Sequence, residues 1–355
     1  MIITRTPYRI SFFGGGTDYP GWYRAHGGSV LSTTIDKYCH ISCRYLPPFF
    51  DTRYRVVYSR IENCADLNSI AHPAVRECLR HMDITRGVEI HHDGDLPARS
   101  GMGSSSSFVV GLLHGLHALK GQMPHKRQLA LESIHLEQEI LREKVGSQDQ
   151  VSVAHGGLNH ILFLPNGEIS VRPVTIGAER MRELNSHLML FYTGIKRTAS
   201  DVAASYVDNI DARKRQLRIM KDLVDEAISV LCGGGSIHGF GELLHESWLA
   251  KRSLSPIVSN NRVEAIYDHA RNAGAVGGKL LGAGGGGFML LFVEPDRRQA
   301  VKDALRNLIH VPFEFEFSGS QIIFFSPEKN YAEEDAARAA APVDSFQELH
   351  EAVCP

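Results

Sequence analysis

The stretch Leu96-Pro-Ala-Arg-Ser-Gly-Met-Gly-Ser-Ser-Ser-Ser-Phe108 constrains this chain more than any other. A β-type run over 88–92 leads into it, and a strongly apolar run over 109–119 leads out of it. A glycine turn that delivers the chain into a helix start leaves backbone N–H groups unpaired, and the helix dipole adds partial positive charge there. The stretch therefore predicts an anion site, for which phosphate is the commonest occupant. A serine-rich capped turn is the alternative.

The composition is that of an ordinary globular protein and narrows the choice of partners. With 355 residues, of which 43% are hydrophobic, the chain can form one large domain or two medium-sized domains. The net charge of -2 gives no sign of a nucleic-acid-binding surface, and no apolar run is long enough to span a membrane. The N-terminus lacks a secretory pattern, and the six cysteines are scattered as in proteins with reduced thiols. We expect a cytoplasmic protein without nucleic-acid or membrane partners, as a monomer or a homodimer.

Apolar periodicity and turn residues predict a chain of mixed strands and helices. The expected strands cover 2–13, 29–45, 54–58, 88–92, 152–164, 168–174, 188–192, 288–293 and 313–325. The expected helices cover 73–82, 105–120, 125–144, 176–185, 240–251, 261–272 and 296–308, and a long charged helix follows Lys196-Arg197 and reaches Leu231. A polar helical linker near 176–185 predicts a domain over 1–185 and a second over 186–326. An acidic, alanine-rich tail over 327–355 is expected to be loosely attached.

Two further glycine stretches stand out. Gly14-Gly-Gly-Thr-Asp-Tyr19 lets the backbone approach a ligand closely and places a carboxylate beside it, although a plain glycine hairpin is equally compatible with these residues. The run Gly277–Gly287 matches the letters of a dinucleotide fingerprint, but it leads into a strand instead of a helix. It also fails as a P-loop, because Ala273 and Leu280 occupy positions that this motif reserves for other residues.

Taken in order, the three glycine stretches resemble the motifs of the GHMP kinase superfamily, which includes galactokinases, homoserine kinases, mevalonate kinases and phosphomevalonate kinases. Its central motif, P-x-x-x-G-(L/M)-G-S-S, is met from Pro97 to Ser105, and its first and third motifs resemble 7–19 and 279–287. The resemblance covers residues 3–325. It implies an α+β, two-domain GHMP kinase fold, with a ribosomal protein S5 domain 2-like N-terminal domain and a ferredoxin-like C-terminal domain. It also implies an ATP-dependent carbohydrate kinase that uses Mg²⁺.

The resemblance gives roles to individual residues. The expected ATP-binding residues are Pro97, Arg99, Ser100, Gly101, Met102, Gly103, Ser104, Ser105 and Ser106. Mg²⁺ is expected at Ser105 and Glu139, because Glu139 precedes Asp149 at the galactokinase spacing, with Glu137 as the close competitor. Asp149 matches the catalytic Asp that accepts or orients the proton of the acceptor hydroxyl, and Arg9 would stabilise the transferring phosphoryl group. Taken alone, Asp149 is better explained as a cap for the segment that follows it.

The expected substrate-binding residues, also implied by the resemblance, are Gly15, Gly16, Thr17, Asp18, Asp149, Lys196, Arg197, Gly284 and Gly285. Galactokinases carry Glu-His where this chain has Gly15-Gly16, and the loss of bulk and negative charge suits a longer or anionic sugar. The Gly-Gly-Gly-Thr-Asp form, together with Gln148-Asp-Gln150 and 193–198, resembles the heptose kinases. These enzymes phosphorylate the anomeric hydroxyl of D-glycero-D-manno-heptose 7-phosphate, on the route to nucleotide-activated heptose for surface polysaccharide.

The basic pair Lys196-Arg197 would then meet the sugar 7-phosphate, with a solvated helix start as the alternative. Two other functions fit the same motifs. One is a kinase for a different sugar, such as fucose, arabinose, a galactose-like sugar or unphosphorylated heptose. The other is a non-catalytic sensor that binds ATP and sugar without turnover. Such a sensor would be expected to lack key residues at the catalytic Asp or in the glycine–serine loop over 97–107, which we call the phosphate loop.

Overall fold

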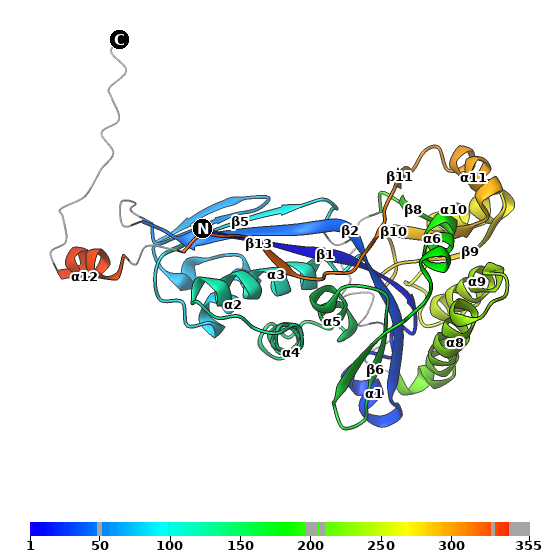
Figure 1. Cartoon of the computed structure of the whole chain (residues 1–355), viewed down its shortest axis with the longest axis horizontal. Coiled ribbons are helices and arrows are strands. Elements are labelled where there is room, and N and C mark those ends of the chain that lie inside the picture. The colour runs from blue at the N-terminus through cyan, green and yellow to red at the C-terminus, as the bar shows by residue number, and fades with distance from the viewer. Residues whose placement is uncertain (48–51, 99, 196–204, 206–209, 328–330, 341–355) are drawn as a thin grey trace, which may run out of the picture.

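The computed structural model describes residues 1–47, 52–98, 100–195, 205, 210–327 and 331–340. Two β-sheets, each with its own helices, lie next to each other along the long axis of the molecule (Figure 1). In the described part of the chain no helix is long and apolar enough to cross a membrane.

The first sheet has nine strands and is built around β1 (Ile2–Phe13) and β2 (Gly28–Tyr45). Its main order is β13-β1-β2-β5-β3-β4, and β6, β7 and β12 extend it from β2. These further strands are β3 (Tyr54–Val57), β4 (Ile61–Cys64), β5 (Val88–Gly94), β6 (Asn159–Phe163), β7 (Ile169–Pro173), β12 (Phe315–Glu316) and β13 (Gln321–Phe325). β1 is buried along most of its length, and completely over 6–13, because helices pack on this part of the sheet.

Helices cover one face of this sheet (Figure 1). The apolar helix α3 (Ser104–Leu119) packs directly on β1 and β2, and the others gather around it. They are α2 (Pro73–His81), α4 (Lys126–His135) and α5 (Gln148–His155). The short helix α1 (Pro20–His26) lies apart from them, beside β6 (Figure 1). A π-helical turn over Leu136–Ile140 follows α4 directly.

The second sheet has four antiparallel strands in the order β11-β8-β10-β9. The strands are β8 (Leu188–Tyr192), β9 (Ala275–Leu280), β10 (Phe288–Val293) and β11 (Ile309–Val311), and the helices are α6 (Ala178–His187), α8 (Lys214–Cys232), α9 (His238–Arg252), α10 (Asn261–Asn272) and α11 (Arg298–Ala304). β10 is apolar throughout and completely buried, so it forms the centre of the second core.

The chain returns to the first sheet after the second one is complete. β12 pairs with β2, and β13 pairs with β1. The predicted second domain over 186–326 is therefore wrong at its C-terminal end, since residues 315–325 belong to the first sheet. The predicted boundary near 185 stays a prediction. Within the predicted tail, α12 (Ala332–Ala340) stands apart from both sheets (Figure 1), and 328–330 and 341–355 lie outside the described residues.

Three predicted elements differ from the structure. The expected strand over 152–164 is helix α5 followed by β6, because Gly156 and Gly157, both with positive φ, separate a helical segment from an extended one. The expected helix over 125–144 ends at Ile140, and the chain then passes through Arg142 at φ 55°. The expected strand over 313–325 is interrupted between β12 and β13. The expected start of the long helix at 196–197 lies outside the described residues, and α8 begins at Lys214.

Candidate active site

The loop before α3 presents the backbone N–H groups of the first helical turn at one place. Gly101 and Gly103 have φ values of 80° and 75°, which glycine adopts without steric cost, and Gly103 is the N-cap of the helix. No side chain caps α3, and the first helical bond runs from the Ser107 N–H to the Gly103 carbonyl at 2.8 Å. The N–H groups of 104–106 thus have no acceptor within the helix. This is the anion-binding geometry predicted from the sequence.

A cavity of about 370 Å³ opens in front of these groups, and both sheets contribute to its walls. The phosphate loop supplies Gly101, Gly103 and 104–106, and the loop after β1 supplies Gly15, Gly16 and Asp18. Asp149 and Arg9 lie in its wall, and the second sheet and its loops contribute Lys251, Lys279, Gly282 and Ala283. Two other cavities, of about 510 and 590 Å³, lack these residues.

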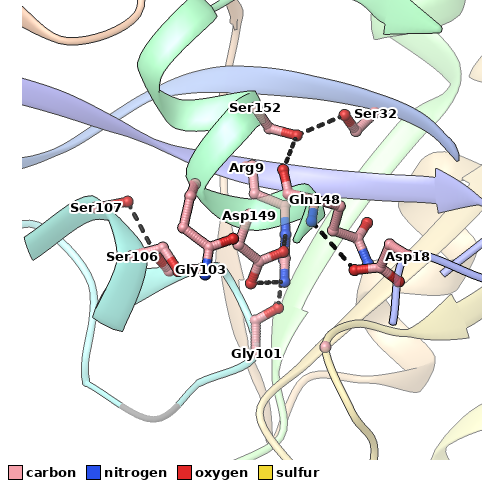
Figure 2. A network of polar contacts seen from close by, with 12 residues as sticks. Arg9, Asp18, Ser32, Gly101, Gly103, Ser106, Ser107, Gln148, Asp149 and Ser152 are labelled. Carbon is pink, nitrogen blue, oxygen red and sulfur yellow. Dashed lines mark hydrogen bonds and ion pairs between the residues drawn. The ribbon is translucent and has the colours of Figure 1, made fainter. Parts of the chain in front are cut away.

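Arg9 and Asp149 form a two-pronged ion pair beside the phosphate loop. The Arg9 Nε–H donates to Asp149 Oδ1 at 2.6 Å and Nη2 donates to Oδ2 at 2.7 Å, while Nη1 donates to the Gly101 carbonyl at 2.7 Å (Figure 2). The Arg9 side chain is only 4% exposed, whereas that of Asp149 is 24% exposed. Arg9 in β1 therefore holds a carboxylate at the start of α5 in a fixed orientation, with one side accessible from the cavity.

Asp18 lies near this pair but is more deeply buried. Its Oδ1 accepts the Gly16 N–H at 2.9 Å, and its Oδ2 accepts the Gln148 N–H at 3.1 Å (Figure 2). Burial raises the pKa of Asp18, and the nearby Asp149 carboxylate raises it further. Asp18 thus shapes the loop after β1 as well as lining the cavity.

The predicted role of Thr17 in substrate binding does not fit its position. Its hydroxyl donates to the carbonyls of Gly14 at 2.8 Å and Ser29 at 3.0 Å, and its side chain is completely buried away from the cavity wall. Thr17 stabilises the fold of the loop and does not face a ligand.

The carboxylate beside the phosphate loop is Glu137, whereas Glu139, which the sequence spacing favours for the metal, does not reach the loop, and the choice of metal ligand between them stays a prediction. The Ser106 hydroxyl donates to Glu137 Oε2 at 2.9 Å, and the Gln150 amide also donates to this oxygen. Glu137 is completely buried, whereas Glu139 is exposed. Residues two apart on a helical turn point to different sides. Only one of these two glutamates can therefore face α3.

The Glu137 carboxyl is fully buried behind Ser106 and is not part of the cavity lining. Burial, and after it Glu143, raise its pKa to about 8 against the opposing effect of the hydrogen bonds from Ser106 and Gln150. Carboxylate and hydroxyl oxygens suit Mg²⁺, which usually takes one or two protein carboxylates and binds substrate phosphates besides. No group of three or more His, Cys, Asp or Glu that could hold a metal occurs among the described residues. The Glu137 and Ser106 oxygens are of the kind that Mg²⁺ takes, and Ser105 is exposed at the edge of the cavity.

The third glycine stretch packs backbone against backbone on the phosphate loop. A Cβ on Gly287 would lie 2.2 Å from the Ser100 carbonyl oxygen, and one on Gly101 would lie 2.7 Å from that of Leu281. Gly284 and Gly285, the predicted substrate contacts, both pack on Val258 and neither lines the cavity, so their role stays a prediction without structural support. Gly282 and Ala283 line it in their place.

The remaining predicted residues lie around the site or outside the described chain. Pro97 is exposed away from the cavity lining, Ser100 is buried, and Met102 belongs to the core while its carbonyl accepts the Arg9 N–H at 3.1 Å. Arg99, Lys196 and Arg197 lie outside the described residues.

Sequence reasoning missed several groups in the cavity wall. Ser11 Oγ and Gln148 Oε1 are buried there without a hydrogen-bond partner, so a ligand with hydroxyl groups could satisfy both. No sequence signal distinguishes Lys251 within a helix of ordinary composition. Lys279 belongs to the third glycine motif, but the motif does not indicate a binding role for its side chain. The signal for Glu137 was present, since Leu129, Ser133 and Glu137 recur at the spacing of one buried helix face.

Comparison with known proteins places this site in a family. Residues 68–157 match the GHMP kinases N terminal domain, and residues 212–310 match the GHMP kinases C terminal domain. The chain is 30% identical over 319 residues to a D-glycero-alpha-D-manno-heptose 7-phosphate kinase of Campylobacter jejuni, covering 86% of this chain and 93% of the relative. It is 26% identical to an L-fucokinase/L-fucose-1-P guanylyltransferase of Bacteroides fragilis, covering 85% of this chain but 35% of that longer protein.

A solved structure agrees with these matches. A D-glycero-D-manno-heptose 1-phosphate kinase of Bacteroides thetaiotaomicron superposes with a TM-score of 0.75 at 22% identity, covering 92% of this chain and 100% of that one. The fold and the site thus define a two-domain phosphotransferase. The chain belongs to the GHMP kinase family. The predicted α+β GHMP fold and the predicted enzyme class, an ATP-dependent carbohydrate kinase, are confirmed.

Proposed function

We propose that this kinase transfers the γ-phosphoryl group of ATP to the anomeric hydroxyl of D-glycero-D-manno-heptose 7-phosphate, giving the 1,7-bisphosphate. The observation that carries the proposal is the Arg9–Asp149 pair, set in one cavity with the phosphate loop and the Gly15-Gly16 loop. The relative from Campylobacter jejuni supports the choice of sugar. We place the reaction in the cytoplasm, within nucleotide-heptose biosynthesis for surface polysaccharide.

The residues divide the reaction between them. The Asp149 carboxylate, held by Arg9, accepts or orients the proton of the acceptor hydroxyl as the new O–P bond forms. The backbone N–H groups at the start of α3 bind the nucleotide phosphates, and Arg9 places positive charge beside the transferring group. Glu137 and Ser106 would hold Mg²⁺, with Ser105 as a further candidate, and the metal supplies compensation for phosphate charge.

The acceptor side of the cavity favours a sugar. Asp18, Ser11 and Gln148 supply polar atoms on one wall, and two of these atoms have no protein partner. Gly15 and Gly16 leave this wall without side chains, which gives space for a sugar longer than a hexose. The intact phosphate loop and the Arg9–Asp149 pair speak against a non-catalytic sensor.

A coupled ADP-release assay over a panel of acceptors tests the proposal. The panel contains heptose 7-phosphate, unphosphorylated heptose, fucose, arabinose, galactose and mevalonate, and ³¹P NMR identifies the phosphorylated position. We expect the highest kcat/KM with heptose 7-phosphate and an anomeric phosphate in the product. A hexose or mevalonate used more efficiently would refute the choice of substrate, and sugar binding without turnover would identify a sensor.

A further inference from the structure

Two buried lysines face the cavity from the side of the second sheet. Lys251, near the end of α9, is 6% exposed, and Lys279, in β9, is 2% exposed. The Lys279 Nζ donates to the Phe12 carbonyl at 2.7 Å, and the Lys251 Nζ donates to the carbonyls of Leu280 at 2.7 Å and Gly282 at 2.5 Å. Among the described residues, no carboxylate lies within ion-pairing distance of either ammonium group.

The two buried ammonium groups have no opposite charge beside them in the described part of the chain. A buried ammonium group without an opposite charge is costly, and an ammonium has three donors, of which Lys279 places one on the protein. Burial, and after it the positive charge of Arg9, lower the pKa of Lys279 to about 7. Burial also lowers the pKa of Lys251, with Lys279 and Arg9 as the next causes. The charged neighbours that act on both lysines are therefore cationic. An anionic ligand would offset the repulsion between these positive charges and stabilise the charged form of each lysine.

A purely structural role accounts less well for these positions. Lys126 shows how this chain joins segments through a lysine, because its Nζ donates to the carbonyls of His155 and Ser318 at 2.6 and 2.7 Å while its side chain stays in solvent. Lys251 and Lys279 make similar bonds without solvent, and both line the cavity that holds Arg9 and Asp149.

We propose that Lys251 and Lys279 form an anion subsite that binds the phosphate group carried by the acceptor. This inference rests on the proposed function, since it concerns how that acceptor is recognised. The nucleotide phosphates already have the backbone donors at the start of α3. Lys279 instead bonds Phe12, close to the Gly14-Gly15-Gly16 turn that forms the acceptor side of the cavity. The paired ammonium groups would thus give the enzyme its preference for a phosphorylated sugar.

The kinetic test compares Lys251→Met and Lys279→Met with wild type, and Lys126→Met is the matched control. ADP release is measured with the phosphorylated and the unphosphorylated form of the same heptose, and the KM for ATP is measured in parallel. We expect each cavity variant to lose about tenfold to a hundredfold in kcat/KM for the phosphorylated heptose, because charged hydrogen bonds to the phosphate are lost. The unphosphorylated heptose, the KM for ATP and the control should change little. An equal loss for both sugars, or a raised KM for ATP alone, would overturn the proposal.

A binding measurement separates this inference from the proposed function. In protein labelled with ¹³C at the lysine ε-carbons, inorganic phosphate should shift the Lys251 and Lys279 signals, which the two Met variants assign. The Lys126 signal should not move. If phosphate shifts these signals but heptose 7-phosphate is not a substrate, the subsite stands and the proposed function fails. If heptose 7-phosphate is turned over but phosphate shifts neither signal, the subsite is refuted.

Discussion

At the scale of single residues, the cavity combines groups that are held rigidly with groups that lack a partner. Each of the three side-chain nitrogens of Arg9 donates a hydrogen bond to Asp149 or Gly101, so the orientation of the Asp149 carboxylate is fixed before any ligand arrives. Ser11 and Gln148 instead keep unsatisfied oxygens. Phosphoryl transfer depends on alignment and charge compensation. It therefore benefits from a carboxylate that is already oriented and from polar atoms that are still available to bind the acceptor.

The substitution Asp149→Asn tests the role of the carboxylate. It keeps the size of the side chain but removes its charge and its ability to take a proton. We expect kcat to fall by about a hundredfold to ten-thousandfold. The dissociation constant for ATP, measured by titration calorimetry, should change by less than about threefold, since ATP phosphates contact other groups. Near-normal turnover would show that Asp149 is not the catalytic group.

The pair Glu137→Gln and Glu139→Gln tests which glutamate serves the metal. We expect Glu137→Gln to raise the Mg²⁺ concentration for half-maximal activity about tenfold or more, in line with the usual cost of losing a metal-site partner. Glu139→Gln, on the exposed side of the π-helical turn, should behave as wild type. The reverse result would restore the choice made from sequence spacing.

At the scale of elements, two loops of the site pack directly against each other, backbone against backbone. The phosphate loop before α3 and the loop between β9 and β10 approach so closely at Ser100 and Gly287 that no side chain fits between them. The helix α3 is in turn fixed to α4 by His117, whose Nε2 lies 2.6 Å from Glu132 Oε2. Movement of one loop is therefore expected to disturb the other.

Replacing Gly287 with alanine should separate these loops. Its φ of 98° is strained for an L-residue, and its new Cβ would collide with the Ser100 carbonyl. We expect a loss of about 2 kcal/mol or more in the free energy of unfolding and at least a tenfold rise in the KM for ATP. Gly234→Ala, whose Cβ would meet nothing within 4 Å, is the control and should leave both quantities unchanged.

The His117–Glu132 contact predicts a pH dependence. Hydrogen bonding to Glu132 raises the pKa of His117 above its ordinary value of 6.5, so the folded state holds a proton that the unfolded state has lost. The contribution to stability is complete below pH 6.5 and disappears as pH rises through the raised pKa. Urea unfolding of wild type and His117→Gln should show a difference that shrinks across this window. A constant difference would contradict the assignment.

At the scale of the whole molecule, the two sheets share an aromatic junction. Phe240 of α9 contacts Phe12 and Phe13 of β1 at 5.4 and 5.1 Å between ring centroids, and Phe292 of β10 at 6.2 Å. All four rings are buried. The catalytic cavity lies across the same two sheets, so its geometry depends on this junction.

Phe240→Ala should therefore weaken the entire protein. Removal of a completely buried ring costs about 3–5 kcal/mol, and we expect one cooperative thermal transition at a lower temperature, followed by calorimetry. Phe317→Ala, at a ring that is 57% exposed, should shift the transition little. Two separate transitions in wild type would show that the sheets unfold independently.

Much of the architecture could be predicted from the sequence because it depends on local patterns. The glycine–serine loop, α3, β8 and β10 follow from turn residues and apolar runs, and the ordered motifs indicate Arg9 and Asp149 as members of one site, although not their ion pair. The return of β12 and β13 could not be predicted, since strand pairing across the chain leaves no local signal. Motif spacing does not separate Glu137 from Glu139, because only the buried face of the helix shows which of them lies toward α3.

The last strand of the first sheet has a consequence for how the protein is made. β13 pairs with β1, and the Ser326 N–H donates to the Met1 carbonyl at 3.0 Å. A ribosome releases β1 first and β13 only after the whole second sheet has emerged. Until then one edge of β1 stays unpaired, and an exposed strand edge invites association with other chains. Premature termination near residue 311 would leave that edge open permanently, so such products should aggregate even though they carry every catalytic residue.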